Sequence, residues 1–297
     1  MEKFFSTAIL IATLRMATPL MLAALGGCFS ERAGVTNIAL EGIMLFGAFA
    51  AVTGSYLTHS AWIGVLVAIV VGALFAYIHA MMSVDLKADQ VISGTALNLL
   101  ASGGTIYLLK IIYKAAGASD RVERLPEWGI YPPTVYIAVI LAIISWIVLY
   151  KTPFGLRLRT VGEHPAAADT VGVDVYNMRY VAVVISGMLA GLAGAHLSIG
   201  VADLFSKNMI SGRGFIALAA MIAGRWNPIG ACIAAILFGY FDRLSMSLSG
   251  TTLLGVQVPS QFIDMLPYII TIVVLAVAGA KSVGPKANGI PYEKGER

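Results

Sequence analysis

The sequence predicts an all-α protein, a polytopic integral membrane helical bundle with about 8–10 transmembrane helices. Of its 297 residues, 58% are hydrophobic and only 12% are charged, whereas about a quarter of the residues of a soluble domain are charged. The mean hydropathy is +0.83. A surface with so few charges suits a lipid bilayer. The composition therefore argues against a soluble enzyme, a nucleic-acid-binding protein or a disordered scaffold.

About nine apolar segments are candidates for membrane-crossing helices, because one crossing needs about 20 apolar residues. Backbone polar groups must be paired inside lipid, so each segment is expected to be helical. The turn Gly224–Pro228 separates two of the segments. The expected segments are 6–28, 34–57, 61–84, 91–112, 134–150, 180–201, 212–224, 229–247 and 262–280.

Basic residues gather after residue 150 and after residue 280, and they predict the orientation of the chain. The positive-inside rule assigns the loop 152–178 and the tail 281–297 to the cytoplasm. The connection 113–133 is then extracytoplasmic. Five earlier crossings would leave the N-terminus outside, and a broken first segment would leave it inside. We expect a single transmembrane domain over residues 1–297.

Glu41 lies inside an apolar segment, where a charged side chain costs about 2.5–3.5 kcal/mol on insertion scales. Asn37 precedes it by one helical turn, so a continuous helix would carry both on one face. Two interpretations remain open. The pair lines the path of a transported solute, or it holds two helices together by hydrogen bonds.

The segment 91–112 carries four hydrogen-bonding side chains at helical spacing, from Thr95 to Thr105. Such a polar stripe inside a membrane suits either a permeation path or hydrogen bonds between helices. The candidate pathway residues are therefore Asn37, Glu41, Thr95, Asn98 and Ser102.

The segment 180–201 contains small residues at every fourth position, namely Ser186, Ala190 and Gly194. This pattern allows helix backbones to approach closely, so it predicts packing. His196 is predicted to be a polar partner inside the bundle, because one histidine does not make a metal site.

The predicted cytoplasmic loop 152–178 is expected to contain a short helix. Glu163 or His164 can begin it, with Pro165 in the first turn, where its missing N–H is not needed. Gly172 is a suitable end. A short helix flanked by arginines suits a docking element for a soluble protein, and a loop lying on anionic headgroups is the alternative.

The chain has no G-x-x-x-x-G-K-[ST], H-E-x-x-H or G-x-S-x-G motif. We therefore expect no catalytic residue, no metal site and no cofactor bound by this chain. Energy for transport must come from another subunit or from an ion gradient.

Three segments, in the expected order, resemble the permease family of branched-chain amino acid and ribose-type ABC importers. Residues 30–42 (SERAGVTNIALEG) resemble the first-half signature, and residues 212–231 resemble the second-half signature. Residues 167–172 are similar to the A-A-x-x-x-G core of the coupling loop. Ala39 departs from the glycine that the family often has there. Within this family, the residues of these segments are most similar to those of simple-sugar and nucleoside permeases.

The resemblance implies a type II ABC importer-like permease that moves nucleosides unchanged across the bacterial cytoplasmic (inner) membrane. Its implied partners are an ABC ATPase subunit that uses ATP-Mg, a second permease subunit in a heterodimer, and an extracytoplasmic substrate-binding protein or lipoprotein. Membrane lipid surrounds the chain, and no nucleic acid is implied. The implied ATPase-coupling residues are Arg157, Arg159, Glu163, His164, Ala167, Ala168 and Gly172.

Alternatives remain at this point. The solute could be a simple sugar or a branched-chain amino acid. A proton-coupled secondary transporter would use Glu41 as its titrating group. An integral membrane enzyme would need convergent polar residues, and Asp242, Arg243 and Asp264 are the available candidates.

Overall fold

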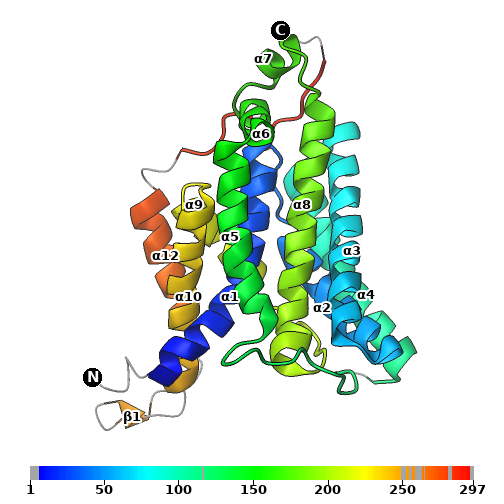
Figure 1. Ribbon diagram of the computed structural model, residues 1–297, viewed down its shortest axis with the longest axis vertical. Helices are drawn as coiled ribbons and strands as arrows, with labels where there is room; N and C mark the ends of the chain where they lie inside the picture. Colours follow the sequence, from blue (N-terminus) through cyan, green and yellow to red (C-terminus); the bar gives the residue numbers. More distant parts are fainter. Residues whose placement is uncertain are drawn as a thin grey trace.

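The computed structural model is an elongated bundle whose long helices run along its longest axis (Figure 1). It describes residues 7–115, 117–248, 252–253, 256–257, 263, 265–279 and 283–294. Two short helices lie at one end of the bundle, which we call the α6–α7 end. The elements are α1 (Thr7–Arg32), α2 (Leu40–Thr58), α3 (Ala61–Ala80), η1 (Met81–Asp85), α4 (Gln90–Tyr113), α5 (Pro133–Lys151), α6 (Pro153–Glu163), α7 (Pro165–Thr170), α8 (Val175–Ala195), η2 (His196–Ala202), α9 (Arg213–Ala223), α10 (Pro228–Leu248), β1 (Thr252–Leu253), β2 (Val256–Gln257) and α12 (Leu266–Gly279).

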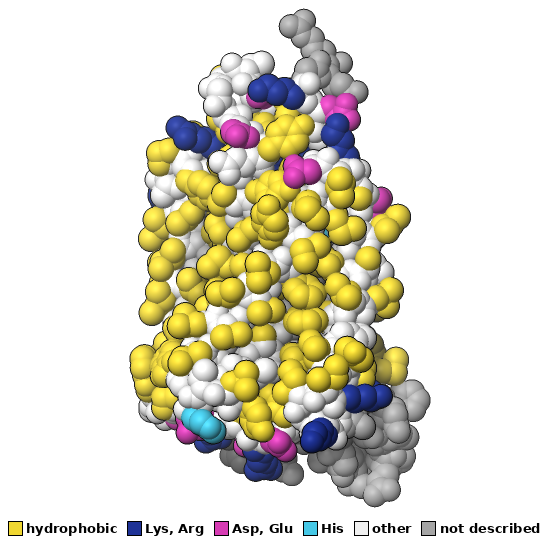
Figure 2. Space-filling view, turned by 90° about the vertical axis from the view of Figure 1, so that its right-hand side faces the viewer, with side chains coloured by type: hydrophobic (Ala, Val, Ile, Leu, Met, Phe, Trp, Pro, Cys, Tyr) yellow, Lys and Arg dark blue, Asp and Glu magenta, His cyan; other side chains and the backbone are white. Residues whose placement is uncertain are grey.

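The predicted helical membrane bundle is confirmed. In the described part of the chain, seven helices are long and apolar enough to cross a membrane, and two shorter apolar helices accompany them. Hydrophobic side chains cover the middle of the surface, while most charged side chains lie at its two ends (Figure 2). A band of this kind matches the hydrocarbon layer and two headgroup layers. The chain is a multi-pass membrane protein.

Two of the expected segments form helices that are too short to cross the membrane. The helix α9 has 11 residues, which is about 16 Å of helix, against about 30 Å of hydrocarbon. Residues 203–212 precede it without α-helical structure, and Asn208 and Ser211 have positive φ. This backbone prevents an upstream extension of α9. The helix α12 has 14 residues, and most of the remaining expected segment 262–280 falls outside the described residues.

The expected segment 34–57 also begins later, because α2 starts at Leu40. Residues 33–39 form a non-helical linker after α1. Asn37 lies in this linker, so it does not share a helix face with Glu41. The prediction of a shared face is wrong, because it assumed one continuous helix.

Helix α1 bends where Pro19 interrupts it (Figure 1). Proline has no N–H, so the carbonyl of Arg15, four residues earlier, loses its helical donor. His196 Nε2 fills that position 2.9 Å from the Arg15 oxygen, and Thr134 Oγ1 lies 2.6 Å from His196 Nδ1. His196 is thus a polar partner inside the bundle, as predicted.

The bend does not reverse α1. Arg15 binds the carbonyl of Ile130 in the loop between α4 and α5, while Arg32 binds Tyr150 at the far end of α5. Helix α1 therefore begins at the end opposite to α6–α7 and finishes at the α6–α7 end. This arrangement matches the count of five crossings, in which the start of α1 and the loop 152–178 lie on opposite sides.

Small residues bring α8 close to two helices. A Cβ on Gly194, in the row that segment 180–201 predicts, would lie 2.1 Å from the Met44 carbonyl oxygen of α2, and Gly187 beside that row meets α3. A Cβ built on Gly187 would lie 2.3 Å from the carbonyl oxygen of Gly72 and 2.2 Å from the Cβ of Ala76. No side chain fits in this space. The close approach lets α8 and α3 pack backbone to backbone in the centre of the bundle.

Candidate functional site

A cavity of about 260 Å³ lies between α2, α4 and the segment that leads into α9. Two helices begin at this cavity, since α2 starts at Leu40 and the short helix α9 starts at Arg213. Its lining combines one carboxylate with amides, hydroxyls and backbone. The lining residues are Glu41, Gly42, Leu45, Asn98, Ser102, Asn208, Ile210, Ser211 and Gly212.

Asn98 of α4 completes the start of α2. Its Oδ1 accepts a hydrogen bond from the Gly42 N–H at 2.8 Å, and its Nδ2 donates to the Ile38 carbonyl at 3.0 Å. The first N–H groups of a helix have no partner within the helix. Asn98 therefore stabilises a helix start inside the bundle, where bulk water is not present to pair with the free N–H groups.

Glu41 of α2 performs the same task for α9. Its two carboxylate oxygens accept hydrogen bonds from the backbone N–H groups of Gly212 and Gly214, at 2.8 and 2.7 Å. A Cβ on Gly214 would lie 2.5 Å from the Glu41 Cα, so only glycine allows this approach. A carboxylate at a helix N-terminus is also favoured by the helix dipole. Glu41 thus both lines the cavity and holds two helices together.

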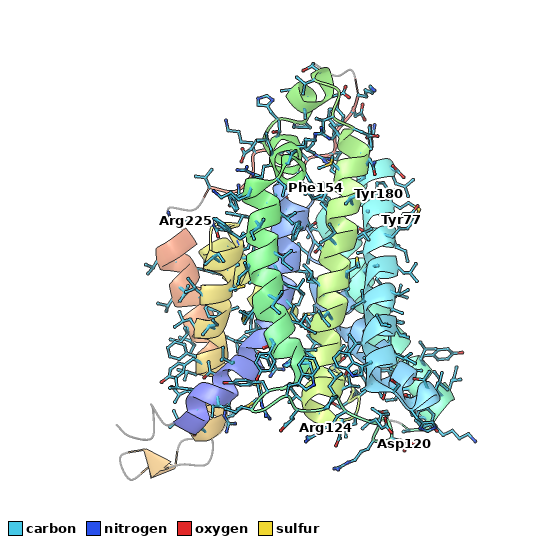
Figure 3. All side chains as sticks on the ribbon, in the orientation of Figure 1. Tyr77, Asp120, Arg124, Phe154, Tyr180 and Arg225 are labelled. Atoms are coloured by element: carbon cyan, nitrogen blue, oxygen red, sulfur yellow. The ribbon has the colours of Figure 1, made fainter. Side chains whose placement is uncertain are left out.

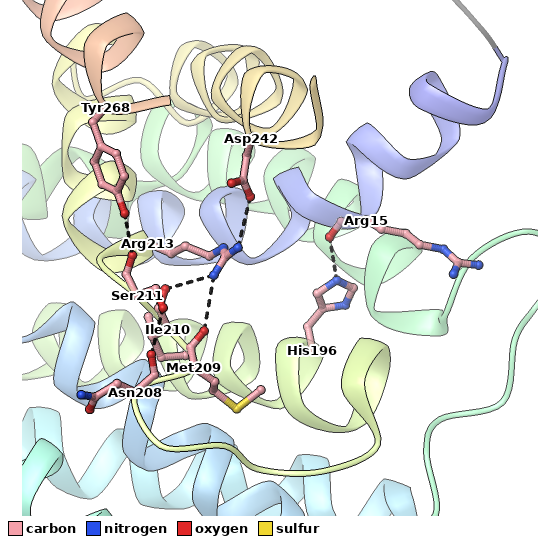
Figure 4. A network of polar contacts seen from close by, with 9 residues as sticks. All are labelled: Arg15, His196, Asn208, Met209, Ile210, Ser211, Arg213, Asp242 and Tyr268. Carbon is pink, nitrogen blue, oxygen red and sulfur yellow. Dashed lines mark hydrogen bonds and ion pairs between the residues drawn. The ribbon is translucent and has the colours of Figure 1, made fainter. Parts of the chain in front are cut away.

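A second polar cluster continues from the cavity (Figure 4). Arg213 forms an ion pair with Asp242 of α10 at 3.2 Å, and it also donates to the carbonyls of Met209 and Ile210. Tyr268 of α12 donates to the Ser211 carbonyl at 3.1 Å. These contacts fix the strained segment before α9 from two neighbouring helices.

The structure brings three of the five predicted pathway residues together at the cavity, namely Glu41, Asn98 and Ser102. Asn37 does not line it, because it is fully buried and its Nδ2 donates to Ser186 of α8 at 2.9 Å. Thr95 is not among the lining residues either, and its hydroxyl donates to the Val91 carbonyl of its own helix. Thus only half of the polar stripe on α4 reaches the cavity.

The contribution of residues 208–212 to this cavity was not predicted from the sequence. Ser102 Oγ lies 3.3 Å from Asn208 Oδ1, and Ser211 and Gly212 supply backbone. Asn and Ser residues followed by Gly form a turn pattern, which was available in the sequence as an indication of a broken helix. Its position opposite Glu41 was not available.

At the α6–α7 end, the predicted short helix is α7, with Pro165 in its first turn. Gly172 follows it with φ +82°, a left-handed conformation that favours glycine. The part of the predicted loop that precedes α7 is also helical and forms α6. Ala168 is fully buried in a small cluster with Val161 and Val175, so its side chain cannot meet a partner protein.

The other predicted coupling residues lie closer to the surface. Arg159 is partly exposed and lies over the ring of Tyr150 at 4.8 Å. The exposed set at this end comprises Arg157, Glu163, His164, Ala167 and Gly172. These residues form a surface at the α6–α7 end.

Residues 283–294 form a strap across the α6–α7 end, and we call them the C-terminal strap. Its backbone bonds both α6 and the linker after α1, through Ala287 N to Gly162 O at 2.9 Å and Gly289 N to Gly34 O at 3.3 Å. Lys294 pairs with Asp169 of α7 at 3.8 Å. The strap therefore connects the α6–α7 helices to the segment that leads into α2. Lys281 and Arg297 of the predicted tail lie outside the described residues.

Asn288 of the strap takes part in a buried cluster that joins the two signature segments. Glu31 Oε2 accepts hydrogen bonds from Trp226 Nε1 at 2.6 Å and from Asn288 Nδ2 at 3.1 Å. The hydroxyl of Thr36 lies 3.1 Å from Asn288 Oδ1. One carboxylate thus ties the end of α1, the turn between α9 and α10, and the strap together.

Burial, together with a hydrogen bond to Asp169, raises the pKa of Tyr292 in the strap above its usual value. In the described part of the chain, no group of three or more His, Cys, Asp or Glu side chains could hold a metal ion.

Comparison with known proteins assigns the chain to a family. Residues 9–275 match the family described as branched-chain amino acid transport system, permease component. The guanosine ABC transporter permease protein NupQ of Bacillus subtilis is 46% identical over 309 residues, which cover 96% of each chain. The nucleoside ABC transporter permease protein NupC of Lactococcus lactis is 41% identical over 301 residues, which cover 94% of each chain.

A more distant relative occurs in one of the same organisms. The guanosine ABC transporter permease protein NupP of Bacillus subtilis is 28% identical and covers 91% of this chain and 81% of its own. The fold is similar to a chain in a solved inward-facing conformation of a metal-chelate type ABC transporter. The TM-score is 0.53 at 17% identity, with 92% of this chain and 85% of that chain covered.

These matches extend along nearly the whole chain and include both signature segments, which the Glu31 cluster joins. The protein therefore belongs to the family of permease components typified by the branched-chain amino acid transport systems.

Proposed function

We propose that this chain is a permease subunit of an ATP-driven ABC importer that carries nucleosides across the bacterial cytoplasmic membrane. The observation that carries the proposal is its identity of 46% and 41%, over nearly full length, to permeases named for guanosine and nucleosides. The chain itself binds no cofactor and catalyses no reaction, and ATP-Mg is used by a separate ATPase subunit.

The cavity chemistry supports a neutral, hydroxylated solute. Asn98, Ser102 and Asn208 offer amide and hydroxyl groups, which can both donate and accept hydrogen bonds. The single lining carboxylate, Glu41, already accepts two backbone hydrogen bonds. A branched-chain amino acid would present an ammonium and a carboxylate, and the lining offers no free pair of opposite charges. A simple sugar remains the second candidate, since it shares the hydroxyl groups.

The same use of Glu41 argues against a proton-coupled carrier. A carrier carboxylate must lose and regain its proton in each cycle. Protonation of Glu41 would weaken its bonds to both N–H groups at the start of α9. We infer instead that Glu41 keeps its two backbone hydrogen bonds and remains structural while the solute passes it.

We infer that the α6–α7 surface docks the ATPase and faces the cytoplasm, with Arg157, Arg159, Glu163, His164, Ala167 and Gly172 as coupling residues. The strap supports this arrangement, because it joins α6 and α7 to the linker before α2 and, through Glu31, to the turn after α9. Displacement of α6–α7 would thereby reach α2 and α9, the two helices that begin at the cavity, as alternating access requires. A second permease, as the pair NupQ and NupP in one organism suggests, and an extracytoplasmic binding protein complete the assembly.

The direct test is uptake by the complex reconstituted in vesicles with its ATPase, second permease and binding protein. We expect labelled guanosine to accumulate only when ATP is present on the side of the membrane that carries the ATPase. Other unlabelled nucleosides should reduce this uptake, whereas leucine and ribose should not. A protonophore should leave uptake unchanged. Uptake that follows the proton gradient, or that leucine abolishes, would overturn the proposal.

A binding assay tests the docking surface separately. Glu163→Arg reverses an exposed charge at the α6–α7 end, so we expect it to reduce retention of the ATPase by the immobilised permease. Glu123→Arg reverses an exposed charge in the loop at the opposite end and serves as the matched control. Equal retention by both variants would refute the docking assignment.

A further inference from the structure

A cleft of about 660 Å³ opens at the α6–α7 end and has no role in the transport path described above. It lies between the ends of α1 and α5 and the turn that joins α9 to α10. Figure 3 shows Arg225 at the same end of the bundle as Phe154, and Arg124 at the other end. We call it the Arg225 cleft, and its lining is Arg32, Trp146, Tyr150, Gly224, Arg225, Asn227, Ile229 and Gly230.

The lining contains two arginines and no acidic side chain. The side chain of Arg225 is exposed, and its guanidinium makes no hydrogen bond or ion pair with the described part of the chain. Its backbone, by contrast, is fixed, since its N–H bonds the Ile222 carbonyl and its own carbonyl accepts from Arg32. An anchored backbone thus presents an uncompensated cation at the cleft.

Arg32 is held in place without a carboxylate partner. Its guanidinium donates to the carbonyls of Trp226 and Arg225, at 3.1 and 3.2 Å, and to the hydroxyl of Tyr150 at 3.2 Å. All of these acceptors are neutral, so the positive charge is not cancelled by them. The neighbouring Glu31 forms no ion pair with Arg32 in the described part of the chain, and its Oε2 accepts hydrogen bonds from Trp226 and Asn288.

Two more cations lie against the aromatic residues of the cleft. Arg159 lies 4.8 Å from the centre of the Tyr150 ring, and Lys151 lies 5.5 Å from the centre of the Trp146 ring. Cation–π contacts position a cation without neutralising it. The cleft therefore collects positive charge from four separate segments, namely the ends of α1 and α5, helix α6 and the turn before α10.

The cleft also lies at headgroup depth. Trp146 and Tyr150 belong to the last turns of α5, and Ile229, which is 39% exposed, belongs to the first turn of α10. Both helices are long and apolar enough to cross the membrane. Aromatic and basic side chains at helix ends are typical of the membrane–water interface, and basic pockets between transmembrane helices suit anionic lipid headgroups.

The positive-inside rule alone does not account for this arrangement. It explains an excess of Lys and Arg in cytoplasmic segments, but not their convergence on one concave, acid-free site. We propose that the Arg225 cleft binds the phosphate of an anionic phospholipid, with Arg225 and Arg32 as the phosphate contacts and Trp146 beside the acyl chains. Guanidinium groups form paired hydrogen bonds with phosphate oxygens, which suits this role.

The test is lipid binding to the purified permease complex in detergent, measured by native mass spectrometry and by the thermal midpoint. We expect phosphatidylglycerol to bind and to raise the midpoint, while phosphatidylcholine at the same concentration does neither. Loss of one charge-assisted contact predicts that Arg225→Gln weakens phosphatidylglycerol binding about tenfold or more. Arg225→Lys keeps the charge and should lose less.

Lys286→Gln is the matched control, because it removes one exposed positive charge from the same end, outside the cleft. We expect it to leave lipid binding within about twofold of the unchanged protein, since surface charges contribute little through water. Equal loss in Arg225→Gln and Lys286→Gln would overturn the proposal in favour of a diffuse basic face. Inorganic phosphate that raises the midpoint as much as the lipid would overturn the lipid assignment.

Discussion

Replacement of Glu41 by glutamine tests whether one carboxylate holds α9 in place. Each oxygen of Glu41 accepts one backbone N–H, from Gly212 at 2.8 Å and Gly214 at 2.7 Å. Glutamine keeps one acceptor oxygen and replaces the other with an NH₂ group, which cannot accept a hydrogen bond. One N–H at the start of α9 therefore loses its partner.

The magnitude follows from these two bonds. A hydrogen bond to a charged group contributes about 1.5–3 kcal/mol. The amide is easier to bury than the carboxylate, which offsets part of the loss, so we expect Glu41→Gln to lower the free energy of unfolding by about 1–3 kcal/mol. Glu41→Ala leaves both N–H groups unpaired and should cost about 2–6 kcal/mol.

The assay is unfolding of the purified permease in mixed micelles by sodium dodecyl sulfate, followed by circular dichroism. Glu123→Gln, an exposed carboxylate in the loop between α4 and α5, is the control and should change the unfolding free energy by less than about 0.5 kcal/mol. The expected order of stability is unchanged protein, Glu41→Gln, then Glu41→Ala. A glutamine variant as stable as the unchanged protein would refute the capping role of Glu41.

Three further predictions follow from particular contacts. Asn98→Leu removes both hydrogen bonds at the start of α2, so ATP-dependent uptake should fall by about tenfold or more, measured in reconstituted vesicles. His196→Leu leaves the Arg15 carbonyl without a donor and should lower the unfolding free energy by about 1–3 kcal/mol, and by less in a Pro19→Ala background, where the restored N–H can bond that carbonyl. Gly187→Ala places a Cβ 2.3 Å from a carbonyl oxygen of α3 and should lower the unfolding free energy by about 1–3 kcal/mol.

Each of these has a matched control. Val70→Leu changes a side chain that is 57% exposed on α3 and should leave uptake unchanged; a loss equal to that of Asn98→Leu contradicts the role of Asn98. If the changes in unfolding free energy of His196→Leu and Pro19→Ala simply add, the two residues do not act on the same Arg15 carbonyl, and the prediction is contradicted. Gly103→Ala adds a Cβ to a position on α4 with no atom within 4 Å, and it should not destabilise the protein. If Gly187→Ala is equally harmless, the close packing of α8 on α3 is wrong.

The sequence was sufficient where the deciding interactions are local or solvent-driven. Long apolar segments must become helices in a bilayer, so the approximate positions of the seven long helices followed from the hydropathy pattern. Pro165 and Gly172 bound the short helix α7, because proline suits a first helical turn and glycine suits the left-handed residue after the last one. Small residues at every fourth position of α8 likewise predicted close packing.

The tertiary structure decided which polar groups meet. Asn37 and Glu41 are neighbours in sequence, yet they serve different helices, because the partner of Glu41, Gly212, lies 171 positions further along the chain. Helix periodicity describes only one element at a time, so it could not show that Asn98 caps α2. Nor could it predict that α2 and α9 begin inside the bundle, since an interior helix start is stable only when another segment supplies its hydrogen-bond partners.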